Sequence, residues 1–236
     1  MNRLPDNLSG KKVLVTCSAS LAPELLSQLE RLGAFPVHTP LIEICPPSDG
    51  FAALDEAIGR LGTFSWAIFT SRNGVEMFFL RLGGITLPSG LQLASVGPGT
   101  AAALSRRGVD VSLVPERYDA EGLLEALSRR VGRGDRLLWP RARDAREILA
   151  CGLRTLGALV EEVEAYVVAM PKGVDRNGFV RLVETEQFDA VLFDSPSAVR
   201  NFVEMVGREG ARRFLASVQV VPIGPVTVKA IDKEIL

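Results

Sequence analysis

The chain contains 236 residues, of which 47% are hydrophobic, 23% charged and 6% aromatic. This length suits one large domain or two small ones, and the composition excludes intrinsic disorder, a collagen-like repeat and a coiled coil. Lys and Arg number 27 against 28 Asp and Glu, so the net charge is −1. A nucleic-acid partner is therefore disfavoured, because such proteins carry a basic excess or a basic face. No uncharged apolar run reaches the roughly 18 residues of a membrane-spanning helix, so we expect a soluble protein without a membrane partner.

Metal and disulfide chemistry are disfavoured by the residues available for them. Cys17, Cys45 and Cys151 are widely spaced and form no CxxC pair, which indicates the reducing cytoplasm, no disulfide framework and no zinc site. His38 is the single histidine, so a two-histidine metal site is excluded and a structural role is favoured. Neither a GxGxxG nor a Walker motif is present. We therefore expect no metal and no cofactor, and a reaction that depends on positioning and hydrogen bonding.

Short β-branched runs alternate with longer amphipathic stretches along the chain, which predicts an α/β protein with mostly parallel sheets. The predicted strands cover residues 12–16, 66–70, 91–96, 109–113, 136–139, 190–194 and 218–222. The predicted helices cover residues 22–32, 50–61, 74–82, 100–107, 120–131, 145–156, 176–186 and 198–206, with a last helix beginning near residue 225.

An internal repeat relates the two halves of the chain. Residues 69–75 (FTSRNGV) resemble 193–199 (FDSPSAV), and 32–34 (LGA) recur at 156–158, both at an offset of 124 residues. Residues 96–100 (VGPGT) recur as 223–227 (IGPVT) at an offset of 127. Three ordered matches at a nearly constant offset predict a duplicated unit at about 12–118 and 136–236. The fold class we expect is two similar doubly wound α/β lobes with parallel sheets.

The second copy is shorter than the first. After Thr100 the first copy continues with the predicted strand 109–113 and helix 120–131, whereas only nine residues follow Thr227. Either the chain is truncated or the second copy has lost its last strand and helix.

Two extended segments, residues 39–46 and 163–170, do not fit inside a simple α/β unit. Each follows a corresponding strand of its copy, alternates apolar and polar residues and is bounded by a proline. We expect them to pair as a two-stranded linker between the lobes. The domains would then be discontinuous, with lobe one formed by residues 1–38 and 171–236 and lobe two by residues 47–162.

Candidate ligand-binding residues lie where predicted strands end and helices begin. Thr70, Ser71 and Asn73 follow one strand, and Gly97 and Thr100 follow another. Ligands of open α/β sheets bind at this edge, where free N–H groups and helix dipoles favour anions. The alternative is that these residues only cap their helices. The second copy repeats the pattern at Ser195, Ser197, Gly224 and Thr227, which favours one anionic ligand shared by both copies.

Other candidates come from the linker and from a predicted strand end. Tyr166 lies in the second extended segment, where its phenol could donate a proton or hydrogen bond to a leaving oxygen, or only reach solvent. Arg141, Arg143 and Arg146 follow the strand 136–139. They could pair with carboxylates of a ligand, or form a solvated first helical turn.

Taken together, the motifs resemble the bacterial uroporphyrinogen-III synthases of tetrapyrrole biosynthesis. The resemblance covers nearly the whole chain. It rests on the order and spacing of VLVT at 13–16, LGA at 32–34, PLIEI at 40–44, FTSRNGV at 69–75, VGPGT at 96–100, VP at 114–115, AEGLL at 120–124, Tyr166, FDSPSAV at 193–199 and IGPVT at 223–227.

The resemblance implies two α/β lobes joined by a two-stranded ladder, with one lobe formed from both chain ends. It implies cyclisation of hydroxymethylbilane to uroporphyrinogen III in the cleft between the lobes, with inversion of ring D, loss of water and no cofactor. The route passes through an azafulvene and a spirocyclic intermediate, and by similarity Tyr166 assists departure of the hydroxyl. Our substrate-binding candidates are Thr16, Thr70, Ser71, Asn73, Gly97, Thr100, Arg141, Arg146, Ser195, Ser197, Gly224 and Thr227.

The resemblance also implies a cytoplasmic enzyme that serves haem, sirohaem or cobalamin synthesis, either alone or fused to or working beside other enzymes of the pathway. We expect a monomer, because no exposed apolar repeat requires a partner. Two positions depart from the family pattern: Cys17 stands where an arginine is frequent, and Asp194 stands where threonine or serine is common. The aspartate would bring negative charge close to an anionic ligand.

Two other classes of function compete with the synthase. A non-catalytic two-lobed binding protein for a small polyanionic ligand would share the fold, although the export signal usual for that class is not recognised. Tandem receiver-like signalling domains would need an acidic cluster after the first strand, where Thr16, Cys17 and Ser18 stand.

Overall fold

The structure, a computed structural model, describes residues 8–235; residues 1–7 and 236 of the predicted first lobe lie outside this range. The chain divides into two compact units. The first, which we call the terminal unit, comprises Met1–Ile44 and Val168–Leu236, and the second, the central unit, comprises Cys45–Val167. Each unit is built around its own sheet. The predicted α/β architecture with two parallel-sheet lobes is thus confirmed.

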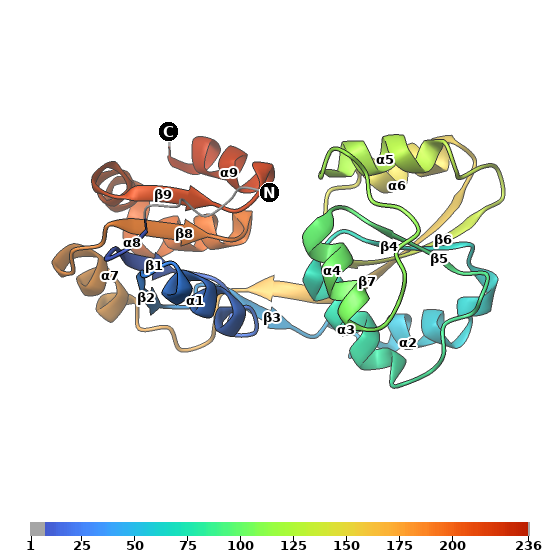
Figure 1. Cartoon of the computed structure of the whole chain (residues 1–236), viewed down its shortest axis with the longest axis horizontal. Coiled ribbons are helices and arrows are strands. Elements are labelled where there is room, and N and C mark those ends of the chain that lie inside the picture. Colours follow the sequence, from blue (N-terminus) through green and yellow to red (C-terminus); the bar gives the residue numbers. More distant parts are fainter. Residues whose placement is uncertain (1–7, 236) are drawn as a thin grey trace. The chain divides into compact units, whose positions relative to one another are not determined.

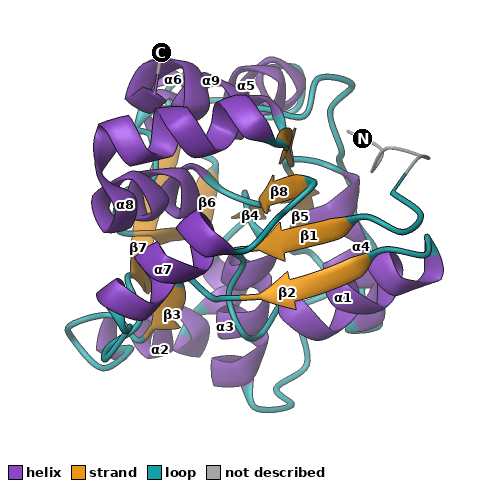
Figure 2. Cartoon of the chain, turned by 90° about the vertical axis from the view of Figure 1, so that its left-hand side faces the viewer, coloured by secondary structure: helices purple, strands orange, loops and turns teal. Residues whose placement is uncertain are grey.

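The sheet of the terminal unit has four parallel strands in the order β2-β1-β8-β9. Figure 2 shows β2, β1 and β8 side by side. The strands are β1 (Lys12–Val15), β2 (Phe35–His38), β8 (Ala190–Phe193) and β9 (Gln219–Pro222), and the helices are α1 (Ala22–Arg31), α7 (Arg176–Thr185), α8 (Pro196–Ser217) and α9 (Pro225–Ile235).

Both faces of this sheet are buried because its central strands are apolar at nearly every position. Leu14 of β1 packs in one cluster with Phe202 of α8, whereas its neighbour Val13 packs in another with Leu29 of α1. Successive side chains of a strand point to opposite faces, so the continuous apolar run of β1 requires helices on both sides.

The sheet of the central unit has five strands in the order β3-β7-β6-β4-β5. Figure 1 shows α5 and α6 on one side of it and α2 and α3 on the other. The strands are β3 (Glu43–Cys45), β4 (Trp66–Phe69), β5 (Gln92–Ser95), β6 (Arg136–Ala142) and β7 (Leu159–Ala169). The helices are α2 (Ala52–Gly59), η1 (Leu61–Thr63, a 3₁₀ turn), α3 (Arg72–Leu82), α4 (Pro98–Arg106), α5 (Ala120–Ser128) and α6 (Ile148–Thr155).

Most predicted elements form within a few residues of their expected bounds, but one prediction is wrong and one helical segment is unpredicted. Residues 109–113 form no strand, and only Leu113 makes an isolated bridge, to Ala94. The helix predicted for residues 198–206 does end at Gly207, whose backbone is not helical (φ 75°, ψ 157°), but a second helical segment that was not predicted follows it within α8, up to Ser217. The predicted extended segments 39–46 and 163–170 contain strand residues of β3 and β7, which are neighbours in the five-stranded sheet.

Among residues 8–235, no helix combines the length and the apolar character that crossing a membrane requires.

Candidate functional site

Parallel strands bring their carboxyl ends to one edge of each sheet, and the predicted site residues gather there. In the central unit, Thr70 and Ser71 follow β4, and Gly97 follows β5. In the terminal unit, Thr16 follows β1 and Ser195 follows β8. Within each unit, the fold therefore places side chains that are distant in the sequence at a common edge.

Ser71 and Ser195 have the same role in the two copies. Ser71 is the N-cap of α3 and its Oγ accepts a hydrogen bond from the N–H of Gly74 at 2.9 Å. Ser195 is the N-cap of α8 and its Oγ accepts from the N–H of Ala198 at 3.2 Å. Both serines thus cap their helices. Because each oxygen accepts in these bonds, each hydroxyl still has a hydrogen to donate.

Tyr166 joins Ser71 in a buried pair of hydroxyl groups. Its Oη lies 2.8 Å from Ser71 Oγ, and the tyrosine is only 5% exposed. Gly74 makes room for this contact, since a Cβ atom there would lie 3.1 Å from the carbonyl oxygen of Pro140 and 3.2 Å from Ser71 Oγ. The pair thus combines the end of β4, the first turn of α3 and strand β7.

An irregularity in the sheet directs Tyr166 toward this position. Glu164 of β7 pairs with Arg141 of β6, but the next pair is Tyr166 with Ala142, so Ala165 is an extra residue on β7. Such a bulge reverses the alternation of side chains beyond it. Glu164 and Tyr166, two positions apart, would otherwise point to the same face of the sheet.

Burial keeps the Tyr166 phenol protonated. Loss of solvent raises its pKa above the ordinary value, and the hydrogen bond with Ser71 opposes this effect in smaller measure. A neutral phenol can donate a hydrogen bond or a proton. If Ser71 donates its hydrogen to Tyr166 Oη, the phenol hydrogen is available to a ligand.

Thr70 is oriented by a residue that sequence reasoning did not select. The indole Nε1–H of Trp139, on β6, donates to Thr70 Oγ1 at 3.1 Å. Trp139 is only 2% exposed and packs in the apolar cluster between the sheet and helices α5 and α6. Thr70 itself is half-buried at the carboxyl edge.

The predicted arginines already have carboxylate partners within the central unit. Arg141 pairs with Glu162 and stacks on Trp139, with its guanidinium carbon 5.0 Å from the ring centroid. Arg146 pairs with Glu121 through two bonds of 2.7 and 3.0 Å. Arg143 likewise pairs with Glu164. In this structure, glutamates of the protein thus bind the arginines for which the sequence predicted carboxylates of a ligand.

Three predicted threonines have little exposed surface. Thr16 is fully buried and donates its hydroxyl to the carbonyl oxygen of Leu192 at 2.9 Å. Thr227 is 2% exposed and donates to the carbonyl oxygen of Ile223, also at 2.9 Å. Thr100, in the first turn of α4, is 6% exposed. The hydrogens of Thr16 and Thr227 therefore serve the main chain in this structure.

The remaining predicted residues differ in their surroundings. Gly97 is extended, and a Cβ atom there would lie 3.1 Å from Tyr118 Cβ, so ring packing explains this glycine. Gly224 has φ +87°, which glycine adopts without strain. Ser197 Oγ accepts a hydrogen bond from Arg200 at 2.9 Å, and Asn73 lies half-buried in the first turn of α3.

The carboxyl edge of the terminal unit also contains an acidic group and a buried thiol. Burial, together with the negative charge of Asp194, raises the pKa of Cys17 to about 12. The carbonyl oxygen of Cys17 lies 2.9 Å from His38 Nε2, so the histidine ring contacts the main chain here. Thr70 of the central unit has Asp194 as its counterpart in the repeat.

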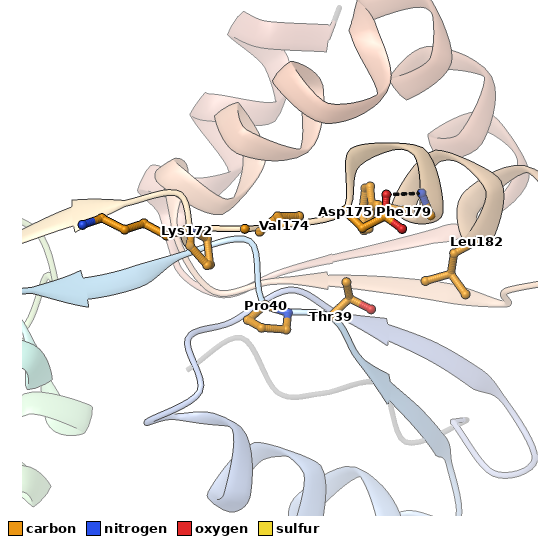
Figure 3. A pocket seen from close by; sticks show the side chains of 10 residues that line it. Thr39, Pro40, Lys172, Val174, Asp175, Phe179 and Leu182 are labelled. Carbon is orange, nitrogen blue, oxygen red and sulfur yellow. Dashed lines mark hydrogen bonds between the residues drawn. The ribbon is translucent and has the colours of Figure 1, made fainter.

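The terminal unit has a cavity of about 490 Å³ beside Thr39 and Pro40, under the first turns of α7 (Figure 3). Its walls include Val174, Phe179 and Leu182. Asp175 caps α7 by accepting from the N–H of Gly178 at 2.9 Å, so a carboxylate already occupies this helix N-terminus. The cavity thus differs from the predicted anion site, where side-chain hydroxyl groups and not a carboxylate cap the helices.

No group of three or more His, Cys, Asp or Glu side chains in the described part of the chain is arranged to hold a metal ion.

Comparison with protein families identifies the relatives of this chain. The model of the Uroporphyrinogen-III synthase HemD family matches residues 23–236. The chain belongs to this family. It is 33% identical over 230 residues to the uroporphyrinogen-III synthase of Synechococcus elongatus, covering 93% of this chain and 85% of that protein. It is 31% identical over 226 residues to a putative uroporphyrinogen-III synthase of Methanothermobacter thermautotrophicus, covering 93% and 88%.

Solved structures of family members share the fold. A mutant uroporphyrinogen III synthase of the extremely thermophilic bacterium Thermus thermophilus matches with a TM-score of 0.64 at 18% identity, and the match covers 94% of this chain and 88% of that one. The enzyme of Helicobacter pylori matches with a TM-score of 0.56 at 16% identity, with the same coverage. At these identities the match shows the fold of the HemD family and leaves the site residues to be argued from chemistry.

Proposed function

We propose that this protein is a uroporphyrinogen-III synthase, which closes linear hydroxymethylbilane to uroporphyrinogen III with inversion of ring D and loss of water. The observation that carries the proposal is the family match over residues 23–236, which includes all three repeated motifs and Tyr166. Relatives of 33% and 31% identity named for this activity support it. The proposed substrate is a small molecule with eight carboxylates, which suits an edge rich in N–H and O–H donors.

In the proposed reaction Tyr166 acts as the proton donor. The C–O bond of the substrate's hydroxymethyl group breaks, the phenol proton goes to the departing oxygen, and water leaves. Electrons from the adjacent pyrrole stabilise the positive charge that is left on the methylene carbon, which gives the azafulvene form. Ring closure later releases a proton, which restores the phenol. Tyr166 carries its proton at neutral pH, since burial raises a pKa that is already high.

The remaining candidates are proposed as substrate contacts and supports. Thr70 and Ser195 have the clearest case as contacts, since each oxygen accepts a protein hydrogen bond and retains a hydrogen to donate. Ser71 is proposed as a support, because its hydrogen goes to Tyr166 when the phenol hydrogen is directed at the substrate. Arg141 and Arg146 would have to exchange a glutamate partner for a substrate carboxylate. The other proposed positions are Thr16, Asn73, Gly97, Thr100, Ser197, Gly224 and Thr227.

A cytoplasmic location is part of the same proposal. It is supported by membership of the HemD family and by the cysteines, which are unpaired in the part of the chain that the structure describes.

The test is an isomer assay on hydroxymethylbilane generated fresh in the cuvette. The products are oxidised, and the type I and type III isomers are separated by chromatography. Spontaneous closure yields type I, so the reaction contains its own control. We expect predominantly type III. Type I alone, with the protein folded, would reject the proposed activity, and a stable complex without type III would support the binding-protein alternative.

The variant Tyr166→Phe tests the proton-donor role. We expect type III turnover to fall by at least about tenfold, because general acid catalysis commonly contributes 10²-fold or more. Stability should change by only about 1 kcal/mol, since the ring is retained and one hydrogen bond is lost. The matched control is Tyr118→Phe, the same chemical change at the other tyrosine, which is 46% exposed. Unchanged turnover in Tyr166→Phe would exclude the role.

A further inference from the structure

The hydrogen bond between Trp139 and Thr70 determines what Thr70 can do. An indole N–H can only donate, so the oxygen of Thr70 is the acceptor in the 3.1 Å bond from Trp139 Nε1. The hydroxyl hydrogen of Thr70 must then point away from the indole. Thr70 is half-buried at the end of β4, where ligands of parallel sheets bind. The arrangement makes Thr70 a hydrogen-bond donor toward an anionic oxygen.

The indole is itself held firmly. Trp139 is 2% exposed among the apolar side chains of β4, α5 and α6, so its ring has little freedom. The guanidinium of Arg141 stacks over the ring, with its central carbon 5.0 Å from the ring centroid. A cation against the ring face attracts π electrons and makes the N–H a stronger donor.

Arg141 is held in turn by groups of the central unit. It pairs with Glu162, and its Nε donates to the carbonyl oxygen of Ala142 at 3.3 Å. Its side chain is only 13% exposed. These contacts hold the Arg141 guanidinium against Trp139 in this structure.

The terminal unit shows that the fold does not require this pair. Leu137 pairs with Trp66 in the central sheet, and Val13 pairs with Ala190 in the terminal sheet, which is the same register at an offset of 124 residues. Val15 therefore corresponds to Trp139, and Asp194 corresponds to Thr70. The indole that donates to a threonine exists in only one copy of the repeat. If folding required this contact, both copies would contain it.

We infer that Trp139 is a positioning residue that aims the Thr70 hydroxyl at a carboxylate of the substrate. The inference rests on the proposed function and deepens it, because it identifies which group of the central unit recognises substrate charge. It predicts that loss of the Trp139 N–H weakens substrate binding only when the Thr70 hydroxyl is present.

A double-mutant cycle tests this inference with hydroxymethylbilane as substrate. Trp139→Phe keeps an aromatic ring beneath Arg141 and removes the N–H, and Thr70→Val keeps the shape of Thr70 and removes the hydroxyl. We expect each variant to raise KM for type III formation about tenfold, as for loss of a hydrogen bond to a charged group. The effect on kcat should be smaller. In the Thr70→Val background, Trp139→Phe should raise KM no further.

The control is Trp66→Phe, the same substitution at the other tryptophan, which is 3% exposed in the same apolar cluster. It should leave KM unchanged, because Thr70 keeps its donor. If Trp139→Phe raises KM by the same factor with and without the Thr70 hydroxyl, or does not raise it, Trp139 contributes only packing and the inference is overturned. If the wild-type protein yields type I alone, the proposed function itself is overturned, so the two failures are distinguishable.

Discussion

Single hydroxyl groups at the sheet edges fall into two kinds, according to the direction of their hydrogen bonds. Thr16 and Thr227 donate to main-chain carbonyl oxygens. Thr70 and Ser195 instead accept from N–H groups, so each retains a hydrogen to donate. For an anionic ligand the second kind is the useful one, since only a donor can bind a carboxylate. The direction of the hydrogen bond thus distinguishes hydroxyl residues that look alike in the sequence, because all of them lie where a strand ends and a helix begins.

At Cys17 the structure predicts a dependence of stability on pH. The pKa of its thiol is raised from 9.0 to about 12 in the folded protein by burial and by Asp194. The folded state therefore stays protonated where the unfolded state ionises. The stabilisation from the neutral thiol is complete below pH 9 and is lost as the pH rises from about 9 to about 12.

Cys17→Ala removes this titration and provides the measurement. At pH 7 the variant should be less stable than the wild type by about 1 kcal/mol, because it loses a buried sulfur atom. In urea unfolding the difference should shrink and then change sign between pH 9 and pH 11, since only the wild type loses the contribution, by about 1.4 kcal/mol for each pH unit. A difference independent of pH would contradict the assigned burial. Cys151, which is exposed, serves for comparison as Cys151→Ala, which should show no such trend.

Sequence reasoning predicted the serine caps but missed the partners of other site residues. The repeat placed Ser71 and Ser195 at equivalent helix starts, and both cap as that local pattern indicates. The contact of Trp139 with Thr70 joins residues 69 positions apart, so no local pattern could show it. Arg143, which directly follows β6, pairs with Glu164 of β7, and this contact depends on a register that the sequence did not specify.

Among the elements, the start of α5 depends on a close backbone approach at Gly122. Its N–H donates to Asp119, the N-cap, at 2.7 Å, and a Cβ atom there would lie 2.1 Å from the carbonyl oxygen of Arg117. A backbone atom cannot move aside as a side chain can. We expect Gly122→Ala to lower the free energy of unfolding by about 1–3 kcal/mol, the usual range for overpacking.

Gly59→Ala is the matched control for this prediction. Gly59 ends α2, and nothing lies within 4 Å of a Cβ atom placed there. Alanine is the better helix former, so this variant should be as stable as the wild type or more stable by up to about 1 kcal/mol. Urea denaturation measures both variants, and equal stability for the two would show that the turn at Arg117 relaxes freely.

The elements that sequence reasoning missed are those decided by pairing or by backbone conformation. Residues 109–113 alternate apolar and polar side chains, yet only Leu113 forms a bridge to β5. Alternation predicts a strand, but a strand also needs a partner along its whole length. In α8, Gly207 adopts φ 75° and the helix resumes beyond it. A glycine is usually a stop signal, and here packing of Ala211 and Phe214 against the core holds the second segment.

On the scale of the whole molecule, the two units differ in how they depend on chain connectivity. All five strands of the central sheet lie between Glu43 and Ala169 in one continuous stretch. The terminal sheet takes β1 and β2 from before that stretch and β8 and β9 from after it. Because β1 lies between β2 and β8, neither end of the chain contains a complete sheet.

We therefore expect residues 43–169 to fold when produced alone. Their apolar cluster, from Trp66 to Val160, is contained entirely in this segment. The fragment should unfold cooperatively in urea, and the free energy of unfolding should fall by about 1–2 kcal/mol per molar urea, as in small domains.

The two terminal segments, residues 1–44 and 168–236, should show no cooperative transition as separate peptides. Each provides two of the four strands and leaves apolar faces such as that of Leu14 uncovered. A chain that joins these two segments through a short linker should regain the transition, and failure of residues 43–169 to fold would show that the central unit requires the rest of the chain.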